Sequence, residues 1–275
     1  MQTLTAKELL DAGVHFGHQT RRWCPKMKPY IFMERNGIYI IDLEKTMQAL
    51  ETGREAIRRI VGAGESVLFV ATKKQAKEVF RDAALQCGQF HVTERWLGGM
   101  LTNFATIRQS IRYLRNLERM AEDGTRERLS KKEASRLAKT RGKLEHTFSG
   151  IKEMHRLPGL VFILDTKREH IAVRECQRLG IPSIGIVDTN ADPEEVTYPI
   201  PGNDDAIRAN ELMTRVIAEA IAEGRFIAEK AGGQVQNPAT AVVDNAVFAA
   251  EQARAREEAK AAQATRDAKL AGESN

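Results

Sequence analysis

The chain has 275 residues, of which 42% are hydrophobic and 29% are charged, with a formal net charge of +5. These proportions are typical of a folded globular protein, and no apolar run approaches the roughly 18 residues that a membrane-spanning helix needs. Cys24, Cys87 and Cys176 lie far apart without C-x-x-C spacing, which argues against a disulfide framework and a structural zinc site. We therefore expect a cytosolic protein with no membrane partner.

Charge is distributed unevenly along the chain. Lys and Arg outnumber Asp and Glu in residues 1–156, whereas acidic residues outnumber basic ones in residues 157–275. This asymmetry predicts one face directed toward a polyanion and another toward solvent or a protein. The alternative is chance clustering of charge on a solvated surface.

The first 41 residues hold three local signals. Thr5 followed by Glu8 has the spacing of a capping box and predicts a short helix over residues 6–11. Residues 19–29 contain four cations, two prolines and no acid, which favours an extended loop. Asn36-Gly37 between two apolar runs predicts a β-hairpin over residues 30–41.

Helical and strand-like segments then alternate. The predicted strands are short and mostly continuously apolar, as expected of strands buried on both faces of a parallel sheet. The predicted strands are residues 67–71, 90–92, 160–164, 184–187 and 196–200, and the predicted helices are residues 43–62, 74–86, 168–179 and 206–226. This order predicts a doubly wound α/β sandwich with right-handed crossovers.

A basic segment, residues 103–156, interrupts this alternation. It holds 14 Lys and Arg residues against 7 Asp and Glu residues. Two apolar seams with helical spacing, interrupted at Arg141, predict two helices packed on each other as an antiparallel coiled-coil hairpin, with a turn near residues 122–125. The seams are Phe104, Ile107, Ile111, Leu114 and Leu117 in the first arm, and Ala134, Leu137, Leu144, Phe148 and Ile151 in the second.

The domain organisation follows from this interruption. Residues 1–102 and 157–229 are expected to form one discontinuous α/β globular domain, with residues 103–156 as the inserted hairpin. Residues 230–275 are rich in Ala and charged side chains and poor in large apolar ones, which predicts a flexible C-terminal tail.

A nucleotide-dependent enzyme is the first reading that such a fold invites. Dinucleotide and mononucleotide sites need glycines directly after a strand, yet neither G-x-G-x-x-G nor G-x-x-x-x-G-K-[ST] follows any predicted strand. No Ser or Cys nucleophile sits in a recognisable elbow. The sequence therefore predicts a protein that is not an enzyme and requires no cofactor.

Cations occupy the positions where chemistry is expected, and they predict contacts with RNA phosphates. The candidates are Arg21, Arg22, Trp23, Lys26 and Lys28 in the N-terminal loop, Lys73 and Lys74 after the first sheet strand, Arg95 before the insertion, and Arg108, Arg112, Arg115, Arg119, Lys131, Lys132, Arg136, Lys139 and Lys143 within it.

Each group also has a structural reading. Trp23 could anchor its loop on the core instead of stacking on a base. Lys73 and Lys74 could lie in a solvated first helical turn. Trp96, next to Arg95, could hold a tight connection against the core. Only one side of each inserted helix can face RNA, so about half of its cations should be irrelevant.

A divalent cation site is a further hypothesis. His18, Asp188, Asp204 and Asp205 fall near the ends of predicted strands, where they could share one ion. The alternative is that Asp204 simply caps the helix that begins at Ala206.

Several motifs, in combination and order, resemble the bacterial ribosomal protein S-two family of the small subunit. They are LLDAGVHFGH at residues 9–18, WCPKM at 23–27, WLGGMLTN at 96–103, LPG at 157–159, IPSIG at 181–185 and DTN at 188–190. The likeness extends to about residue 229.

The resemblance implies a flavodoxin-like or Rossmann-like three-layer sandwich with an inserted coiled-coil hairpin. It also implies a structural constituent of the small ribosomal subunit, located in the cytoplasm on that subunit. Expected partners are small-subunit ribosomal RNA and other small-subunit proteins, notably ribosomal protein S-one, which the family helps to recruit. No homo-oligomer is expected. A second reading, a protein scaffold docking through the acidic half and the helix over residues 206–226, is compatible with this one.

Overall fold

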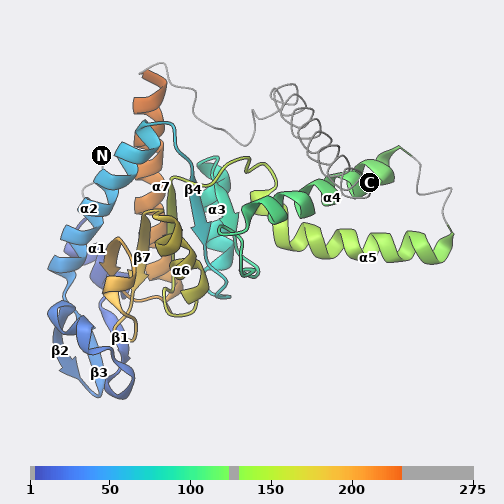
Figure 1. Ribbon diagram of the computed structural model, residues 1–275. Coiled ribbons are helices and arrows are strands. Elements are labelled where there is room, and N and C mark those ends of the chain that lie inside the picture. Colours follow the sequence, from blue (N-terminus) through green and yellow to red (C-terminus); the bar gives the residue numbers. More distant parts are fainter. Residues whose placement is uncertain (1–3, 124–129, 231–275) are drawn as a thin grey trace, which may run out of the picture. The chain divides into compact units, whose positions relative to one another are not determined.

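A five-stranded parallel sheet forms the centre of the computed structural model, which describes residues 4–123 and 130–230 (Figure 1). The strand order is β5-β4-β6-β7-β8. Counted within this sheet, the order is 2-1-3-4-5, that of doubly wound flavodoxin-like proteins. The strands are β4 (Val67–Val70), β5 (Phe90–Val92), β6 (Leu160–Ile163), β7 (Ser183–Val187) and β8 (Tyr198–Pro201). The predicted parallel α/β architecture is therefore confirmed.

Helices cover both faces of this sheet, which explains why its strands are continuously apolar. One face carries Val67, Phe69 and Phe162, which pack with helices α2, α3 and α7. The other face carries Leu68 and Val161, which pack with α6 and with the bases of α4 and α5. The helices are α2 (Leu43–Gly62), α3 (Lys77–Gln86), α4 (Phe104–Glu122), α5 (Lys131–Phe148), α6 (His170–Leu179) and α7 (Ile207–Lys230).

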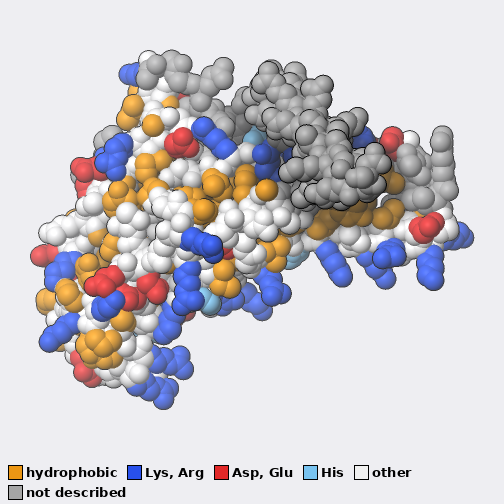
Figure 2. Space-filling model, viewed as in Figure 1, with side chains coloured by type: hydrophobic (Ala, Val, Ile, Leu, Met, Phe, Trp, Pro, Cys, Tyr) orange, Lys and Arg blue, Asp and Glu red, His pale blue; other side chains and the backbone are white. Residues whose placement is uncertain are grey.

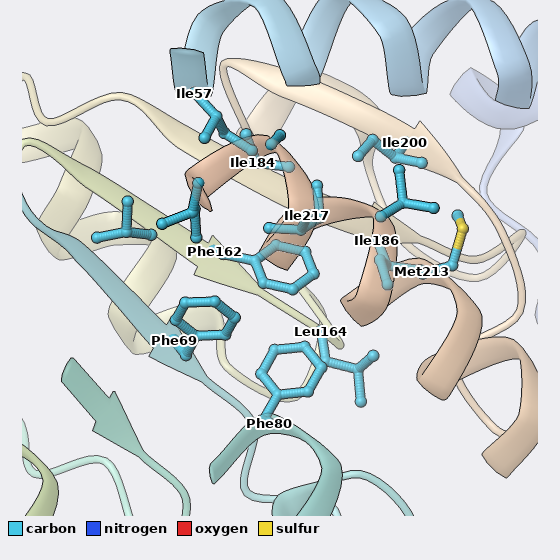
Figure 3. Packing of buried hydrophobic residues seen from close by; sticks show 14 of the residues in the cluster. Ile57, Phe69, Phe80, Phe162, Leu164, Ile184, Ile186, Ile200, Met213 and Ile217 are labelled. Carbon is cyan, nitrogen blue, oxygen red and sulfur yellow. The ribbon is translucent and has the colours of Figure 1, made fainter. Parts of the chain in front are cut away.

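An aromatic cluster fills the first face (Figure 3). The rings of Phe80 and Phe162 stack with centroids 4.8 Å apart, and Phe69 meets Phe162 edge-on at 5.6 Å. All three side chains are fully buried, so they contribute several kcal/mol to folding by the usual scale of about 1.5–3 kcal/mol for each large apolar side chain. The cluster joins α3 to strands β4 and β6.

The predicted helix and turn signals near the N-terminus are confirmed. Thr5 and Glu8 form the capping box of α1 (Ala6–Asp11). Asn36 and Gly37 adopt φ angles of 53° and 75°, as the tight turn between β2 (Ile31–Arg35) and β3 (Ile38–Ile41) requires. β1 (Phe16–Gln19), which the sequence did not indicate, pairs with β3 and completes a three-stranded antiparallel sheet.

The prediction of an extended loop over residues 19–29 was wrong. This segment contains two 3-10 helices, η1 (Thr20–Arg22) and η2 (Pro25–Tyr30). Pro25 stands at the start of η2, where its fixed φ suits a helical turn and its missing N–H costs no hydrogen bond. Several boundaries also differ: α3 begins at Lys77 rather than residue 74, α6 at His170 rather than 168 and β8 at Tyr198 rather than 196, and α7 continues past residue 226 to Lys230.

The two helices predicted in the insertion are present and pack on each other (Figure 1). Ile107, Ile111, Leu114 and Leu117 of α4 are buried, and α5 is followed by η4 (Ser149–Ile151). Arg141, which interrupts the second seam, keeps a buried Nε without a hydrogen-bond partner among the described residues. The predicted turn includes Gly124 and Thr125, which lie outside the described residues, so the coiled-coil hairpin and the domain boundaries remain predictions.

None of the helices described in residues 4–123 and 130–230 is both long enough and apolar enough to span a bilayer. The predicted tail, residues 230–275, lies outside the described part of the chain except for its first residue.

Candidate nucleic-acid interface and cation cluster

The carboxyl edge of the parallel sheet gathers side chains from four strand ends. Lys73 follows β4, Asp165 follows β6, Asp188 follows β7, and Asp204 and Asp205 follow β8. Because parallel strands all end at the same edge, residues far apart in sequence become neighbours there. β4 and β6 flank the point at which the strand order reverses, so Lys73 and Asp165 stand where such folds usually bind a ligand.

Lys73 is the cationic centre of this edge. Its Nζ lies 2.8 Å from Asp204 Oδ1, 2.6 Å from Asp205 Oδ1 and 3.7 Å from Asp165 Oδ2. The side chains of Lys73 and Asp204 are only 12% and 3% exposed, so water screens their attraction weakly. Lys73 therefore neutralises the cluster, whereas the sequence placed it among the RNA contacts.

His18 approaches the same edge from the N-terminal sheet. Its Nδ1 lies 3.0 Å from Asp188 Oδ1, and its Nε2 lies 3.6 Å from Asp205 Oδ2. The other carboxylate oxygen of Asp188, Oδ2, is buried and has no hydrogen-bond partner among the described residues. Donor atoms of His18, Asp188 and Asp204 all lie within 4.8 Å of one another, close enough to share one ion.

The alternative role of Asp204 as a helix cap was wrong. Asn203 Oδ1 instead accepts hydrogen bonds from the backbone N–H groups of Asp205 and Ala206, at 2.8 and 3.3 Å. The Asp204 carboxylate turns away toward Lys73. The Asp204 carboxylate is free to join the cluster because Asn203 binds the backbone N–H groups just ahead of α7.

The titration of this cluster follows from its burial. Burial, with Asp165 and Asp188 nearby, raises the pKa of Asp204 to about 7, although Lys73 opposes the shift. The hydrogen bond to Asp188 raises the pKa of His18 above its usual value. Both groups hold their protons to higher pH in the folded protein than in the unfolded chain. The free energy of unfolding therefore falls through Asp204 as the pH rises from about 4 to about 7, and through His18 as the pH rises above about 6.5.

The N-terminal segment covers this edge. The backbone N–H groups of Cys24 and His18 donate to the carbonyl and the hydroxyl of Thr189, at 2.7 and 2.8 Å. A Cβ on Gly17 would lie 2.5 Å from Thr189 Cγ2, so only glycine allows this approach. The crevice that binds nucleotides in related folds is thus occupied by the chain's own residues.

The predicted RNA-binding residues of the N-terminal loop divide into two groups. Lys26 pairs with Asp192 at 2.8 Å and with Glu194 at 2.5 Å, beside η5 (Pro193–Glu195). Trp23 is half-buried against Tyr39, with ring centroids 5.2 Å apart. Lys26 is exposed but already paired, whereas the other exposed candidates are Arg21, Arg22 and Lys28, together with Lys74 and Arg95 elsewhere in the chain.

The prediction that Trp96 holds its connection against the core is confirmed. It is 7% exposed and its Nε1 donates to Glu175 at 3.0 Å. Arg95 beside it points to solvent, so the two neighbours take different roles.

On α5 four exposed cations form one row, which we call the basic stripe: Lys132, Arg136, Lys139 and Lys143. Their spacing of four, three and four residues keeps them within one side of a helix, opposite the apolar seam. Figure 2 shows Lys and Arg side chains along the outer edge of the region that α5 occupies in Figure 1. Lys131 lies about a quarter turn away from the stripe.

The cations of α4 are less uniform. Arg115 donates to the Lys152 carbonyl and the Glu153 carboxylate, both at 2.8 Å. Arg112 and Arg119 are exposed, and Arg108 is half-buried. The α5 stripe is therefore the more regular basic surface.

An exposed apolar surface that the sequence did not indicate lies on the three-stranded sheet and the adjoining helix α1. We call it the apolar patch, and its members are Leu10, Phe16, Phe32, Met33 and Ile38. The patch surrounds a hollow of about 760 Å³, and Phe32 is 71% exposed. Apolar residues at successive positions of the short strand β2 were the available signal, but they read equally well as buried.

Comparison with known proteins identifies relatives. A family model described as ribosomal protein S2 matches residues 9–224. The small ribosomal subunit protein uS2 of Treponema pallidum subsp. pallidum is 58% identical over 223 residues, covering 81% of this chain and 77% of that protein. The protein of the same name from Treponema pallidum (strain Nichols) shows the same identity and coverage.

The pairing of Lys73 can be tested by Lys73→Met. Removing one partner of a buried ion pair should lower the free energy of unfolding by about 3–5 kcal/mol. The loss should be larger at pH 8 than at pH 5, because at pH 5 the Asp204 carboxyl takes up a proton instead. Urea denaturation at both pH values measures this. Lys74→Met, at the exposed neighbouring cation, is the control and should change the value by no more than about 0.5 kcal/mol. Equal losses in the two variants would contradict the assignment.

Proposed function

This chain belongs to the ribosomal protein S2 family, and we propose on that premise that it binds small-subunit ribosomal RNA through the basic stripe of α5. Family membership makes it a structural constituent of the small ribosomal subunit in the cytoplasm, with a role in translation and not an enzyme.

The basic stripe is the observation that carries this proposal. Its four cations are exposed and lie along about 16 Å of helix, taking a rise of about 1.5 Å per residue. A row of Lys and Arg along one helix face binds phosphates without reading bases. Such recognition by charge and shape suits folded RNA, whose deep, narrow major groove hides its base edges.

A second set of cations extends the proposed interface. Arg21, Arg22, Lys28, Lys74, Arg95 and Arg112 are exposed and supply further phosphate contacts. Lys26 and Arg115 already have carboxylate partners, which an RNA phosphate would have to displace. Lys73 is omitted, because its transfer to RNA would leave buried carboxylates without their cation.

The proposal predicts a specific salt dependence. Lys139→Ala combined with Lys143→Ala should weaken binding to small subunits depleted of this protein. It should also lower the slope of log K against log salt by about two, since each lost phosphate contact removes about one. Arg174→Ala with Arg178→Ala, which removes two exposed cations from α6, is the matched control and should leave the slope near that of the unmodified protein. A slope unchanged in the stripe variant, or lowered equally in both, would argue against the stripe.

We further propose that the apolar patch recruits ribosomal protein S-one, the partner that the family resemblance suggested. Exposed apolar clusters of this kind mark protein interfaces, whereas contacts with RNA phosphates require charged or polar groups. The patch lies on the N-terminal sheet and α1, whereas the basic stripe lies on α5. Binding of RNA and of a protein therefore need not compete for one surface.

Phe32→Ser tests this docking. Losing one large apolar contact of roughly 1.5–3 kcal/mol should reduce the S-one bound to purified subunits about tenfold or more at limiting S-one concentration. Quantitative mass spectrometry of subunits that contain equal amounts of this chain provides the readout. Phe226→Ser, at a similarly exposed aromatic residue on α7, is the control. Normal S-one occupancy in Phe32→Ser subunits would refute the docking site.

A divalent cation at His18, Asp188 and Asp204 is a third proposal, supported by the orphan oxygen Asp188 Oδ2. One imidazole nitrogen and two carboxylates suit Zn²⁺ or Mn²⁺ better than Ca²⁺, which prefers oxygen ligands alone. A carboxylate has two oxygens, so Asp204 can keep its contact with Lys73 while it offers the other. The exposed Asp205 stands beside the site.

Equilibrium dialysis of the untagged chain against Zn²⁺, followed by elemental analysis, tests this site. We expect one ion bound per chain. Binding should be at least about tenfold weaker in Asp188→Asn. Removing a residue that only orients a metal ligand typically costs about tenfold or more in affinity, and removing the charge of a ligand itself should cost at least as much. Asp82→Asn, at an exposed acid outside the cluster, should bind normally. Unchanged Zn²⁺ binding in Asp188→Asn would place any ion elsewhere.

A further inference from the structure

Glu175 of α6 is a buried carboxylate with an unusual set of partners. It is 6% exposed and accepts five hydrogen bonds, all from uncharged donors. Its Oε1 receives Trp96 Nε1 at 3.0 Å and the Gly99 N–H at 2.8 Å. Its Oε2 receives the N–H groups of Leu101 and Thr102, each at 2.9 Å, and the Thr102 hydroxyl at 3.0 Å.

The chemistry of these partners explains how the charge survives burial. An isolated carboxylate in the protein interior is costly unless hydrogen bonds replace its hydration. Burial would raise the pKa of Glu175, but the hydrogen bonds from Thr102, Trp96, Leu101 and Gly99 outweigh it and hold the pKa below its usual value. Glu175 is therefore an ionised group at neutral pH, and its donors are drawn tightly around it.

The donors all come from one short connection between β5 and α4. Within it, Gly99 has φ +88°, a left-handed conformation that other residues rarely adopt. Met100 N–H donates to the Leu97 carbonyl at 3.1 Å, and Asn103 N–H to the Gly99 carbonyl at 2.9 Å. The turn thus winds around the carboxylate immediately before α4 begins at Phe104.

The start of α4 has no cap of its own. Asn103 occupies the N-cap position, yet its side chain makes no capping hydrogen bond to the helix backbone. The carboxylate of Glu175 lies just ahead of the helix start, where a negative charge also suits the helix dipole. A neighbouring helix therefore supplies the order that a local cap normally provides.

We propose that Glu175 is a positioning residue that fixes the turn over residues 96–102 and thereby the direction in which α4 leaves the sheet. Its consequence for RNA rests on the proposed function, because α5 packs on α4 and carries the basic stripe. The competing explanation is that apolar packing alone holds α4, since Trp96, Leu101, Ile107 and Ile111 also belong to the core.

Glu175→Gln separates these explanations. The substitution keeps the side-chain size but turns one acceptor into a donor that faces N–H groups. The amides of Gly99, Leu101 and Thr102 should then exchange with deuterium about tenfold faster or more, as the loss of a charged hydrogen bond implies. Amides in β6 should exchange at unchanged rates. Unchanged exchange at Gly99, Leu101 and Thr102 in a folded variant would overturn the proposal in favour of packing alone.

Binding to depleted small subunits gives an independent readout. In Glu175→Gln every cation of the basic stripe is still present, so binding should weaken while its salt slope stays constant. Loss of stripe cations should instead lower the slope. If the exchange result holds and binding is unaffected, Glu175 positions the turn but the stripe does not depend on it. That outcome would overturn the claim that Glu175 sets the direction of α4, whereas the stripe itself is tested by the variant that lacks Lys139 and Lys143.

Milder variants keep the test decisive if Glu175→Gln does not fold. Trp96→Phe and Thr102→Val each remove one side-chain donor and leave the carboxylate in place. Each should accelerate exchange at Gly99, Leu101 and Thr102 by a smaller factor than Glu175→Gln would. Tyr113→Phe, at an exposed residue of α4, is the control and should leave these amides unchanged. Wild-type exchange in both donor variants would overturn the proposal.

Discussion

Neutralisation of buried carboxylates at the carboxyl edge of the parallel sheet is the interaction on which the rest of the structure depends. Lys73 contacts acids that follow β6 and β8, and His18 contacts the acid that follows β7. These contacts join the segments that follow β4, β6, β7 and β8 to one another and to β1 of the N-terminal sheet. Without them, the edge would hold several like charges in a region of low dielectric, where their repulsion is strong.

This arrangement also explains how a nucleotide-type fold serves a structural role. Lys73 and Asp165 stand at the point where the strand order reverses, and the segment around His18 covers the neighbouring strand end at Thr189. The chain's own residues thus occupy the place where related folds hold phosphate, and the cations that remain exposed lie on the outer surface. The function then follows from the surface features, since a fold of this kind supports many activities.

The two helices inserted between β5 and β6 are rooted in the domain's core through their bases. Ile107, Ile111 and Phe148 belong to the same apolar cluster as the sheet residues Leu68 and Val161. Glu175 adds hydrogen bonds to the turn just before α4, including one from the Leu101 N–H. Apolar packing and the hydrogen bonds of Glu175 therefore both hold the base of the insertion. Because the core is close-packed, they also fix the orientation of its outer, basic surface.

The sequence by itself determined the five strands of the parallel sheet, the α-helices and the tight turn, because continuous apolar runs, helical spacing, Thr5 with Glu8 and Asn36 with Gly37 act locally; it did not indicate β1, η1 or η2. It also marked the insertion as basic and His18, Asp188 and Asp204 as companions at the strand ends. Only the tertiary structure decided that Lys73 is internal, that Phe32 is exposed and that Glu175 organises the entry to α4. The physical reason is separation along the chain: Lys73 meets Asp204 across 131 residues, and Glu175 meets Leu101 across 74. Local sequence signals carry no information about such partners, so their pairing is settled by packing of the whole domain.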